Sequence, residues 1–161
     1  MSVNQGWSPE EEETLWKALM KFGVGNWRVI LDSGCLPGKN PAQMYLQTQR
    51  ILGQQSISEF TGLHIDCRAI GALNRAKLNV ARKNRLITNA GRKLSKIELA
   101  KKLKENKEKF EVDESVWMAI KLPRPSLSIN KCISEKKLQL NLLETELAQV
   151  REKIVQLRKR K

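Results

Sequence analysis

The stretch GWSPEEEETLWKALMKFGVGNWRVIL, residues 6–31, decides the fold of the N-terminal third. Ser8 and Pro9 followed by four glutamates predict a helix that begins at Pro9, because a hydroxyl caps free N–H groups, proline suits the first turn and carboxylates favour the positive end of the dipole. The apolar residues that follow recur at spacings of three and four and so share one face: Leu15, Ala18, Leu19 and Phe22. Gly23 ends this helix, and Asn26 is placed to cap the next one.

Two shorter helices are expected after it. Trp27, Ile30 and Leu31 form an apolar stripe that ends at the break 32–34. Pro41 again suits a helix start, and apolar residues continue from there to Gly53: Met44, Leu46, Ile51 and Leu52. The pattern predicts an all-α protein in which residues 1–53 form a three-helix unit around two tryptophans.

This segment resembles a Myb/SANT-like (homeodomain-like) repeat, on residues that stand in register: Trp7, Leu15, Ala18, Phe22, Gly23, Asn26, Trp27 and Ile30. The resemblance implies a helix-turn-helix whose third helix, NPAQMYLQTQRIL, enters the major groove of DNA. Thr48 stands where the family usually has a third tryptophan, and residues 45–47 replace positions that are commonly basic. A repeat that contacts protein instead of DNA is therefore the alternative.

Four further motifs extend the resemblance to about Asp66: KFGVGNW, ILDSGCLPGK, QTQRILGQQS and FTGLHID. Together they are similar to homeodomain-like proteins of ciliates, algae and other protists, among them small accessory subunits of DNA N6-adenine methyltransferase complexes. The resemblance implies methyltransferase-fold catalytic subunits and another accessory subunit as partners. It also implies that the catalytic and cofactor-binding residues belong to those partners.

The charge of the chain points to a polyanionic partner. The net charge is +13, and residues 68–109 alone carry 14 basic and 3 acidic side chains. Few aromatics interrupt this segment, which favours duplex backbone contact over base stacking; a merely solvated surface and RNA binding are the alternatives. The candidate DNA-binding residues are Lys39, Gln43, Gln47, Arg50, Arg75, Lys77, Arg82, Lys83, Arg85, Arg92 and Lys93.

Beyond the N-terminal unit we expect an ordered connecting loop at 54–67, a basic helical segment at 68–122, a linker at 123–130 and a coiled-coil-forming helix at 131–161. Ser95 and Glu98 form a capping box inside the basic segment. The last helix carries an a/d seam, here called the heptad seam, which is the candidate partner-binding site: Leu140, Leu143, Leu147, Val150, Ile154 and Leu157.

The charges beside the heptad seam favour a different partner helix. Lys153 and Arg158 would repel each other in a parallel homodimer. A heteromeric coiled coil is therefore expected. The alternative is that this helix packs on the chain's own N-terminal unit.

Catalytic chemistry is poorly supported. His64 is the only histidine, the three cysteines (Cys35, Cys67 and Cys132) lie far apart, and no glycine-rich phosphate loop is present. We expect no cofactor, no metal, no membrane partner, a reducing compartment and, from the terminal RKRK, the nucleus. The leading interpretation is a non-catalytic, DNA-binding accessory subunit of an adenine N6-methyltransferase complex, and the alternative is a protein-binding assembly subunit of a nuclear or chromatin complex.

Overall fold

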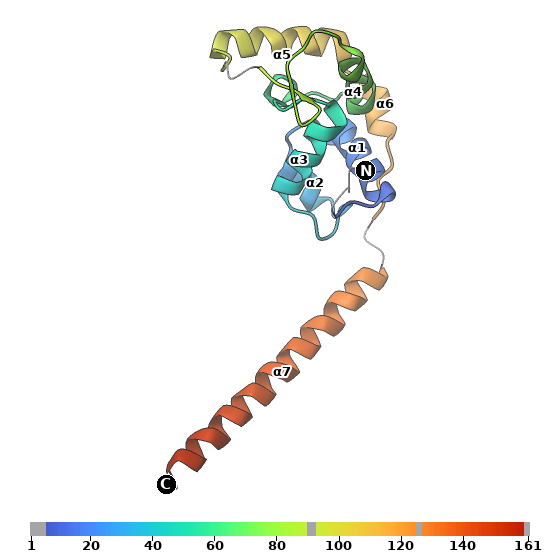
Figure 1. Cartoon of the computed structure of the whole chain (residues 1–161). Helices are drawn as coiled ribbons and strands as arrows, with labels where there is room; N and C mark the ends of the chain where they lie inside the picture. Colours follow the sequence, from blue (N-terminus) through green and yellow to red (C-terminus); the bar gives the residue numbers. More distant parts are fainter. Residues whose placement is uncertain (1–5, 90–92, 125–126, 160–161) are drawn as a thin grey trace. The chain divides into compact units, whose positions relative to one another are not determined.

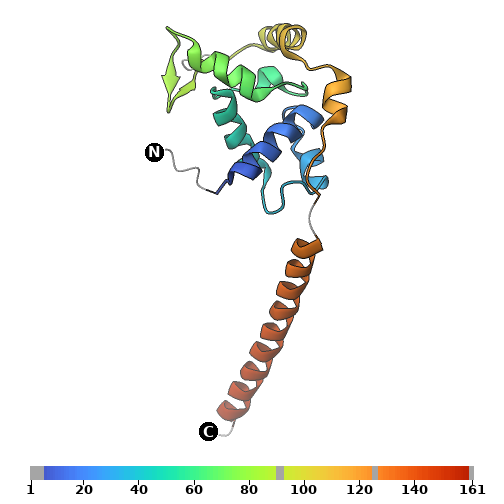
Figure 2. The same cartoon turned by 90° about the vertical axis from the view of Figure 1, so that its right-hand side faces the viewer.

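Seven α-helices, one 3-10 turn and one small hairpin make up the described part of the chain, residues 6–89, 93–124 and 127–159 of a computed structural model (Figures 1 and 2). The chain divides into two units, Met1–Arg124 and Pro125–Lys161. The elements are α1 (Pro9–Phe22), α2 (Trp27–Asp32), α3 (Pro41–Leu52), η1 (Ser58–Phe60), α4 (Cys67–Ala76), β1 (Arg82–Lys83), β2 (Leu86–Ile87), α5 (Lys96–Phe110), α6 (Glu114–Ala119) and α7 (Leu127–Lys159). The predicted all-α class is confirmed.

The ends of α1 and α3 follow the predicted local signals. Ser8 closes a capping box with Glu11, whose N–H donates to the Ser8 hydroxyl at 3.2 Å. Asn40 forms the same arrangement at the start of α3, and Gly53 ends that helix at φ +69°. The expected cap at Asn26 is wrong: its side chain donates to the Phe22 carbonyl at 2.6 Å, so it closes the end of α1 and leaves α2 without a side-chain cap.

The core of the three-helix unit continues into the connecting segment. Its fully buried large residues from the helices are Leu15, Leu19, Ile30, Met44 and Leu52. Phe60, Leu63 and Ile65 complete this core from residues 54–67. The segment is also tied down by backbone bonds, since the N–H of Val24 donates to Leu63 and the N–H of Gly62 donates to Val24. Burying these side chains is the main stabilising contribution here, at about 25 cal/mol per Å² of apolar surface.

Helix α4 packs against the C-terminal half of α3. Asp66 caps α4 by accepting from the N–H groups of Arg68 and Ala69. At the other end, the buried Asn74 amide donates to the Leu52 carbonyl at 2.9 Å and to the Gln54 side chain at 2.8 Å. These bonds satisfy buried polar groups and fix α4 to the end of α3.

The prediction of a helical segment over 68–122 is wrong at residues 82–87. There the chain forms the antiparallel hairpin β1–β2, in which Arg82 pairs with Ile87 and Lys83 with Leu86. Asn84 and Arg85 both have positive φ, +52° and +66°. Two left-handed residues in succession form the type I′ kind of turn that reverses a two-residue hairpin, and they cannot continue a helix.

Helices α5 and α6 return the chain to the N-terminal unit. Helix α5 lies on η1, where Asn106 donates to the Glu59 carbonyl at 3.0 Å and Lys102 pairs with the Glu59 carboxylate at 3.4 Å. Trp117 of α6 stacks on the His64 ring at 4.1 Å. A packing role therefore accounts for the single histidine.

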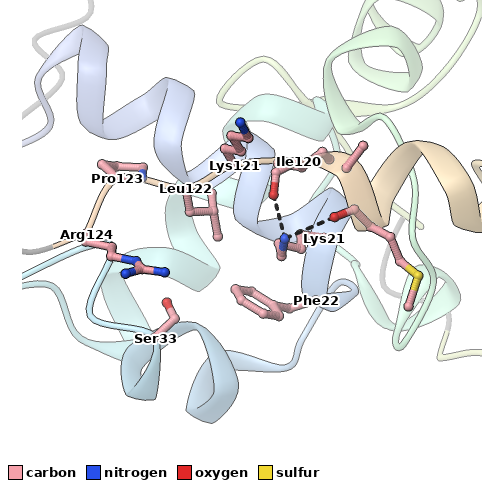
Figure 3. Close-up of a pocket in the computed structure, with 10 residues that line it drawn as sticks. Lys21, Phe22, Ser33, Ile120, Lys121, Leu122, Pro123 and Arg124 are labelled. Carbon is pink, nitrogen blue, oxygen red and sulfur yellow. Dashed lines mark hydrogen bonds between the residues drawn. The ribbon is translucent and has the colours of Figure 1, made fainter.

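Lys21 of α1 holds the C-terminal end of α6. Its ammonium donates to the carbonyls of Ile120 and Met118 at the edge of a pocket of about 690 Å³, which Phe22, Leu122 and Arg124 also line (Figure 3). A cation at a helix C-terminus satisfies free carbonyls and opposes the dipole. This lysine is thus part of the structure rather than a free charge.

Helix α7 begins at Leu127, so the predicted linker over 123–130 is wrong in its second half. Residues 127–130 contain no proline or glycine, and the seam's helix extends back through them. Every side chain of the heptad seam is exposed in α7, by 43 to 65%. Within the described residues, no helix is long and apolar enough to cross a membrane.

Candidate nucleic-acid interface

Arginines from three elements meet on one face of the first unit. Arg50 of α3, Arg75 of α4 and the hairpin residues Arg82 and Arg85 line one pocket of about 470 Å³. A second pocket of about 370 Å³ shares Arg50 and Arg75 and adds Arg68. We call these five residues the arginine surface; the helices and the hairpin that carry it are seen in Figures 1 and 2.

Hydrogen bonds inside the protein position Arg50 and Arg75. The Arg50 guanidinium donates to the Gln47 side-chain oxygen at 3.3 Å, and the Gln47 amide donates to Glu12 at 2.7 Å. Arg75 donates to the Ile51 carbonyl at 3.5 Å. Each guanidinium has five N–H donors, so these bonds orient it and leave donors for a phosphate.

Arg82 is mainly an anchor for the hairpin. One of its nitrogens, Nη2, lies 2.7, 3.1 and 3.4 Å from the carbonyls of Asn74, Lys77 and Arg75 at the end of α4. A guanidinium at that place satisfies carbonyls that the helix leaves free and opposes its dipole. Arg82 therefore holds the hairpin against α4, and its other terminal nitrogen, Nη1, donates to the Arg85 carbonyl at 3.5 Å.

Arg68 is a site residue that the sequence reasoning missed. Its guanidinium lies 4.3 Å from the centre of the Trp16 ring, and the Trp16 N–H donates to Asp66 at 2.8 Å. Stacking on an aromatic face holds the cation in place. The available signal was spacing, because Arg68 and Arg75 are seven residues apart and so share one face of a helix.

Two predicted DNA-binding residues are used inside the protein. The Lys39 side chain is only 10% exposed; it pairs with Glu11 at 2.8 Å and lies 4.8 Å from the centre of the Trp7 ring. Gln47 is 3% exposed and bonds to Glu12 and Arg50. Lys39 lies in the loop before α3 and Gln47 lies in α3. Bonds within the protein occupy both side chains, so the structure does not support them as contacts to DNA.

The other candidates are more peripheral. Gln43 is exposed, but its side-chain oxygen accepts from the Asn40 N–H in the capping box at 3.0 Å. The Lys77 ammonium donates to the Asn74 side chain at 2.7 Å, while Lys83 and Lys93 are exposed. Arg92 lies outside the described residues.

The outer face of α3 offers few groups for reading bases. Its exposed residues include Ala42 and Leu46, four residues apart, and Tyr45, whose ring contacts Trp27 edge-on at 6.5 Å between centroids. Apolar side chains contact thymine methyl groups but do not distinguish the hydrogen-bonding edges of bases. The structure therefore offers more positively charged groups beside α3 than hydrogen-bonding groups on its outer face that could recognise bases.

The arrangement suits binding rather than catalysis. Guanidinium groups pair with phosphate oxygens through two parallel hydrogen bonds, and five arginines line the two pockets of this surface. Within the described ranges, no group of three His, Cys, Asp or Glu side chains is placed to hold a metal ion. The buried cysteines are poor nucleophiles, since burial and the nearby Asp66 charge raise the pKa of the Cys67 thiol to about 12 and burial raises that of Cys35.

The first unit thus contains a three-helix segment whose third helix lies beside the arginine surface. Residues 4–52 match the family model described as the Myb-like DNA-binding domain, which supports the Myb/SANT assignment of this segment. Comparisons with curated proteins and with solved structures returned no match.

Proposed function

We propose that this protein is a non-catalytic subunit that holds duplex DNA through its arginine surface. The observation that supports this most directly is the convergence of Arg50, Arg75 and Arg85 on one pocket at the C-terminal end of α3. In homeodomain-like proteins the third helix enters the major groove, and the C-terminal end of that helix contacts the sugar–phosphate backbone. In this proposal Arg50, Arg75 and Arg85 contact the backbone at that end of α3.

The finer proposal is that the protein is an accessory subunit of a nuclear DNA N6-adenine methyltransferase complex. The sequence motifs up to Asp66 support it, as does the exposed heptad seam of α7. An exposed apolar seam is costly in water and is covered when a partner helix packs on it. In this proposal the methyltransferase-fold subunits supply the chemistry, another accessory subunit completes the assembly, and α7 joins this chain to one of them in a heteromeric coiled coil.

DNA binding is tested by fluorescence anisotropy with a labelled duplex of about 20 base pairs, which is about two helical turns. The double variant R50A/R75A should bind about tenfold or more weakly, because each arginine that is removed takes a charge-assisted bond to phosphate with it. The control K101A/K104A removes two exposed charges of α5 and should bind nearly as the wild type. Equal weakening in both variants would mean that the charge of the basic segment, rather than the arginine surface, carries binding.

A second candidate function is that of a protein-binding assembly subunit. It is favoured by three exposed apolar side chains of α2 and α3: Val29, Tyr45 and Leu46. Copurification of the full chain followed by mass spectrometry separates the two functions when it is combined with the anisotropy measurement. Recovery of methyltransferase subunits together with no affinity of the free chain for DNA would favour the assembly role, and reproducible absence of methyltransferase subunits would contradict the finer proposal.

A further inference from the structure

The tip of the β1–β2 hairpin has an unusual composition. Asn84 and Arg85 occupy the two central positions of the turn with φ of +52° and +66°. Turns of this kind favour asparagine followed by glycine, because most side chains crowd the backbone when φ is positive. An arginine at the second position is disfavoured locally, and such an outlier is a reason to ask what the side chain does.

The hairpin is fixed to the end of α3. The N–H of Ile87 donates to the Gly53 carbonyl at 2.9 Å, and the N–H of Gln55 donates back to the Ile87 carbonyl at 2.9 Å. On the other strand, Arg82 bonds to carbonyls at the end of α4. The tip therefore keeps a set position relative to α3.

The Arg85 side chain is available to a partner. It is exposed, and its guanidinium makes no hydrogen bond or ion pair with any residue in the described part of the chain. It lines the same pocket as Arg50 and Arg75, so arginines of α3, α4 and the hairpin tip border one hollow.

We propose that the hairpin acts as a wing whose tip enters the minor groove of DNA, with Arg85 as the inserted side chain. This inference rests on the proposed function. Helix α3 has 12 residues, a length of about 18 Å, and in the proposed function its C-terminal end contacts the phosphates that border the major groove, as the third helix of homeodomain-like proteins does. Arg50 and Arg75 meet those phosphates, and the wing extends past them to the neighbouring groove.

The chemistry of the tip suits that groove. Arginine and asparagine are side chains that proteins use to read the minor groove, and narrow A·T-rich grooves attract arginine most strongly. The outer face of α3 is largely apolar and offers little base recognition. In this proposal the wing therefore makes the protein prefer DNA with a narrow minor groove.

The test compares Arg85→Gly and Arg85→Lys with the wild-type chain on two duplexes of equal length, one built of A-tracts and one of G·C pairs. Glycine suits the left-handed turn, so Arg85→Gly should fold at least as well as the wild type. We expect it to lose about tenfold affinity for the A-tract duplex and about twofold for the G·C duplex. Arg85→Lys keeps the charge and serves as the matched control.

Netropsin, a ligand of A·T minor grooves, should compete with the wild type on the A-tract duplex and much less with Arg85→Gly. Equal losses on both duplexes, full rescue by Arg85→Lys and no competition by netropsin would overturn the wing and leave Arg85 as a phosphate contact. A wild-type chain that binds neither duplex would instead overturn the proposed function on which the wing rests.

Discussion

Gly71 lies where α4 crosses the end of α3. A Cβ atom built on it would stand 1.9 Å from the Ile51 carbonyl oxygen, so no other residue fits without moving one helix. In a helix interior, glycine to alanine normally adds about 0.5–1 kcal/mol of stability. Here we expect Gly71→Ala to reduce the free energy of unfolding by about 1–3 kcal/mol, as overpacked sites do.

Urea unfolding measures this change, with Ala72→Ser on the exposed side of α4 as a control that should change little. A stabilised Gly71→Ala variant would show that α4 packs less closely on α3 than the structure has it. Because α4 carries Arg68 and Arg75, the same variant should also weaken DNA binding.

The Glu11–Lys39 pair predicts a pH dependence of stability. Burial tends to raise the pKa of Glu11, but the hydrogen bonds from Lys39 and the Ser8 backbone and the Lys39 charge outweigh it, so the pKa lies below its usual value. A lowered folded-state pKa adds stability above the unfolded-state pKa of about 4.5, and this contribution disappears as the pH falls through the folded-state value.

Glu11→Gln should therefore cost about 1 kcal/mol at pH 7 and less at pH 3, since this pair is partly exposed. Urea unfolding at the two pH values measures the difference. The exposed Glu108→Gln should follow the wild-type pH profile. A Glu11→Gln deficit that is the same at both pH values would show that the interaction of Glu11 with Lys39 is not electrostatic.

Single residues also show how far a site is predictable from sequence. Arg75 and Arg85, which were predicted to bind DNA, are exposed and line one pocket, whereas Lys39 and Gln47, which were predicted with them, bond to glutamates of α1. Charge and spacing can be read along the chain. Which glutamate bonds to Lys39 and which bonds to Gln47 depends on how α1 packs against α3 and the loop before it. That packing is tertiary structure, which the local sequence pattern does not specify.

At the scale of elements, a helix or strand was predictable from the sequence where interactions between residues close in the sequence determine it. Both ends of α1 and α3 and the start of α5 were predicted correctly because caps and glycines act within four residues. The hairpin was missed because its turn lacks glycine and its strands are two residues long. Its stability comes from bonds to Gly53, Gln55 and the end of α4, which lie elsewhere in the sequence.

This dependence predicts the effect of Arg82→Ala. Without the guanidinium at the end of α4, the amides of Gln55, Ile87 and Thr88 should exchange with solvent about tenfold faster. A charge-assisted bond contributes about 1.5–3 kcal/mol, and part of that free energy stabilises the hairpin against local opening. Native-state hydrogen exchange measures this, and the Gly23 amide at the end of α1 is the internal control. Arg82→Lys should rescue only in part, because one ammonium cannot copy the planar donor set. Unchanged exchange would mean that the hairpin does not depend on this contact.

At the scale of the whole molecule, the two units carry different chemistry. The first unit, Met1–Arg124, holds the arginine surface, and the second, Pro125–Lys161, holds the heptad seam. Separate units with separate surfaces are expected to lose their functions independently, because mutations without shared contacts act additively. The proposed role of the protein, to link DNA to a partner, requires both.

Two sets of variants test this independence. Leu147→Glu with Ile154→Glu places charge in the seam and should abolish copurification with the partner while leaving the affinity of the free chain for duplex DNA unchanged. The matched control Gln149→Glu with Gln156→Glu adds the same charge outside the seam and should keep the partner.

The variant R50A/R75A should show the reverse, because it should keep the partner and bind DNA more weakly. The slope of log affinity against log salt should fall by up to about 2, near 0.9 for each phosphate that the variant no longer neutralises. Loss of DNA binding or of folding in the seam variant would instead mean that α7 packs on the first unit of its own chain.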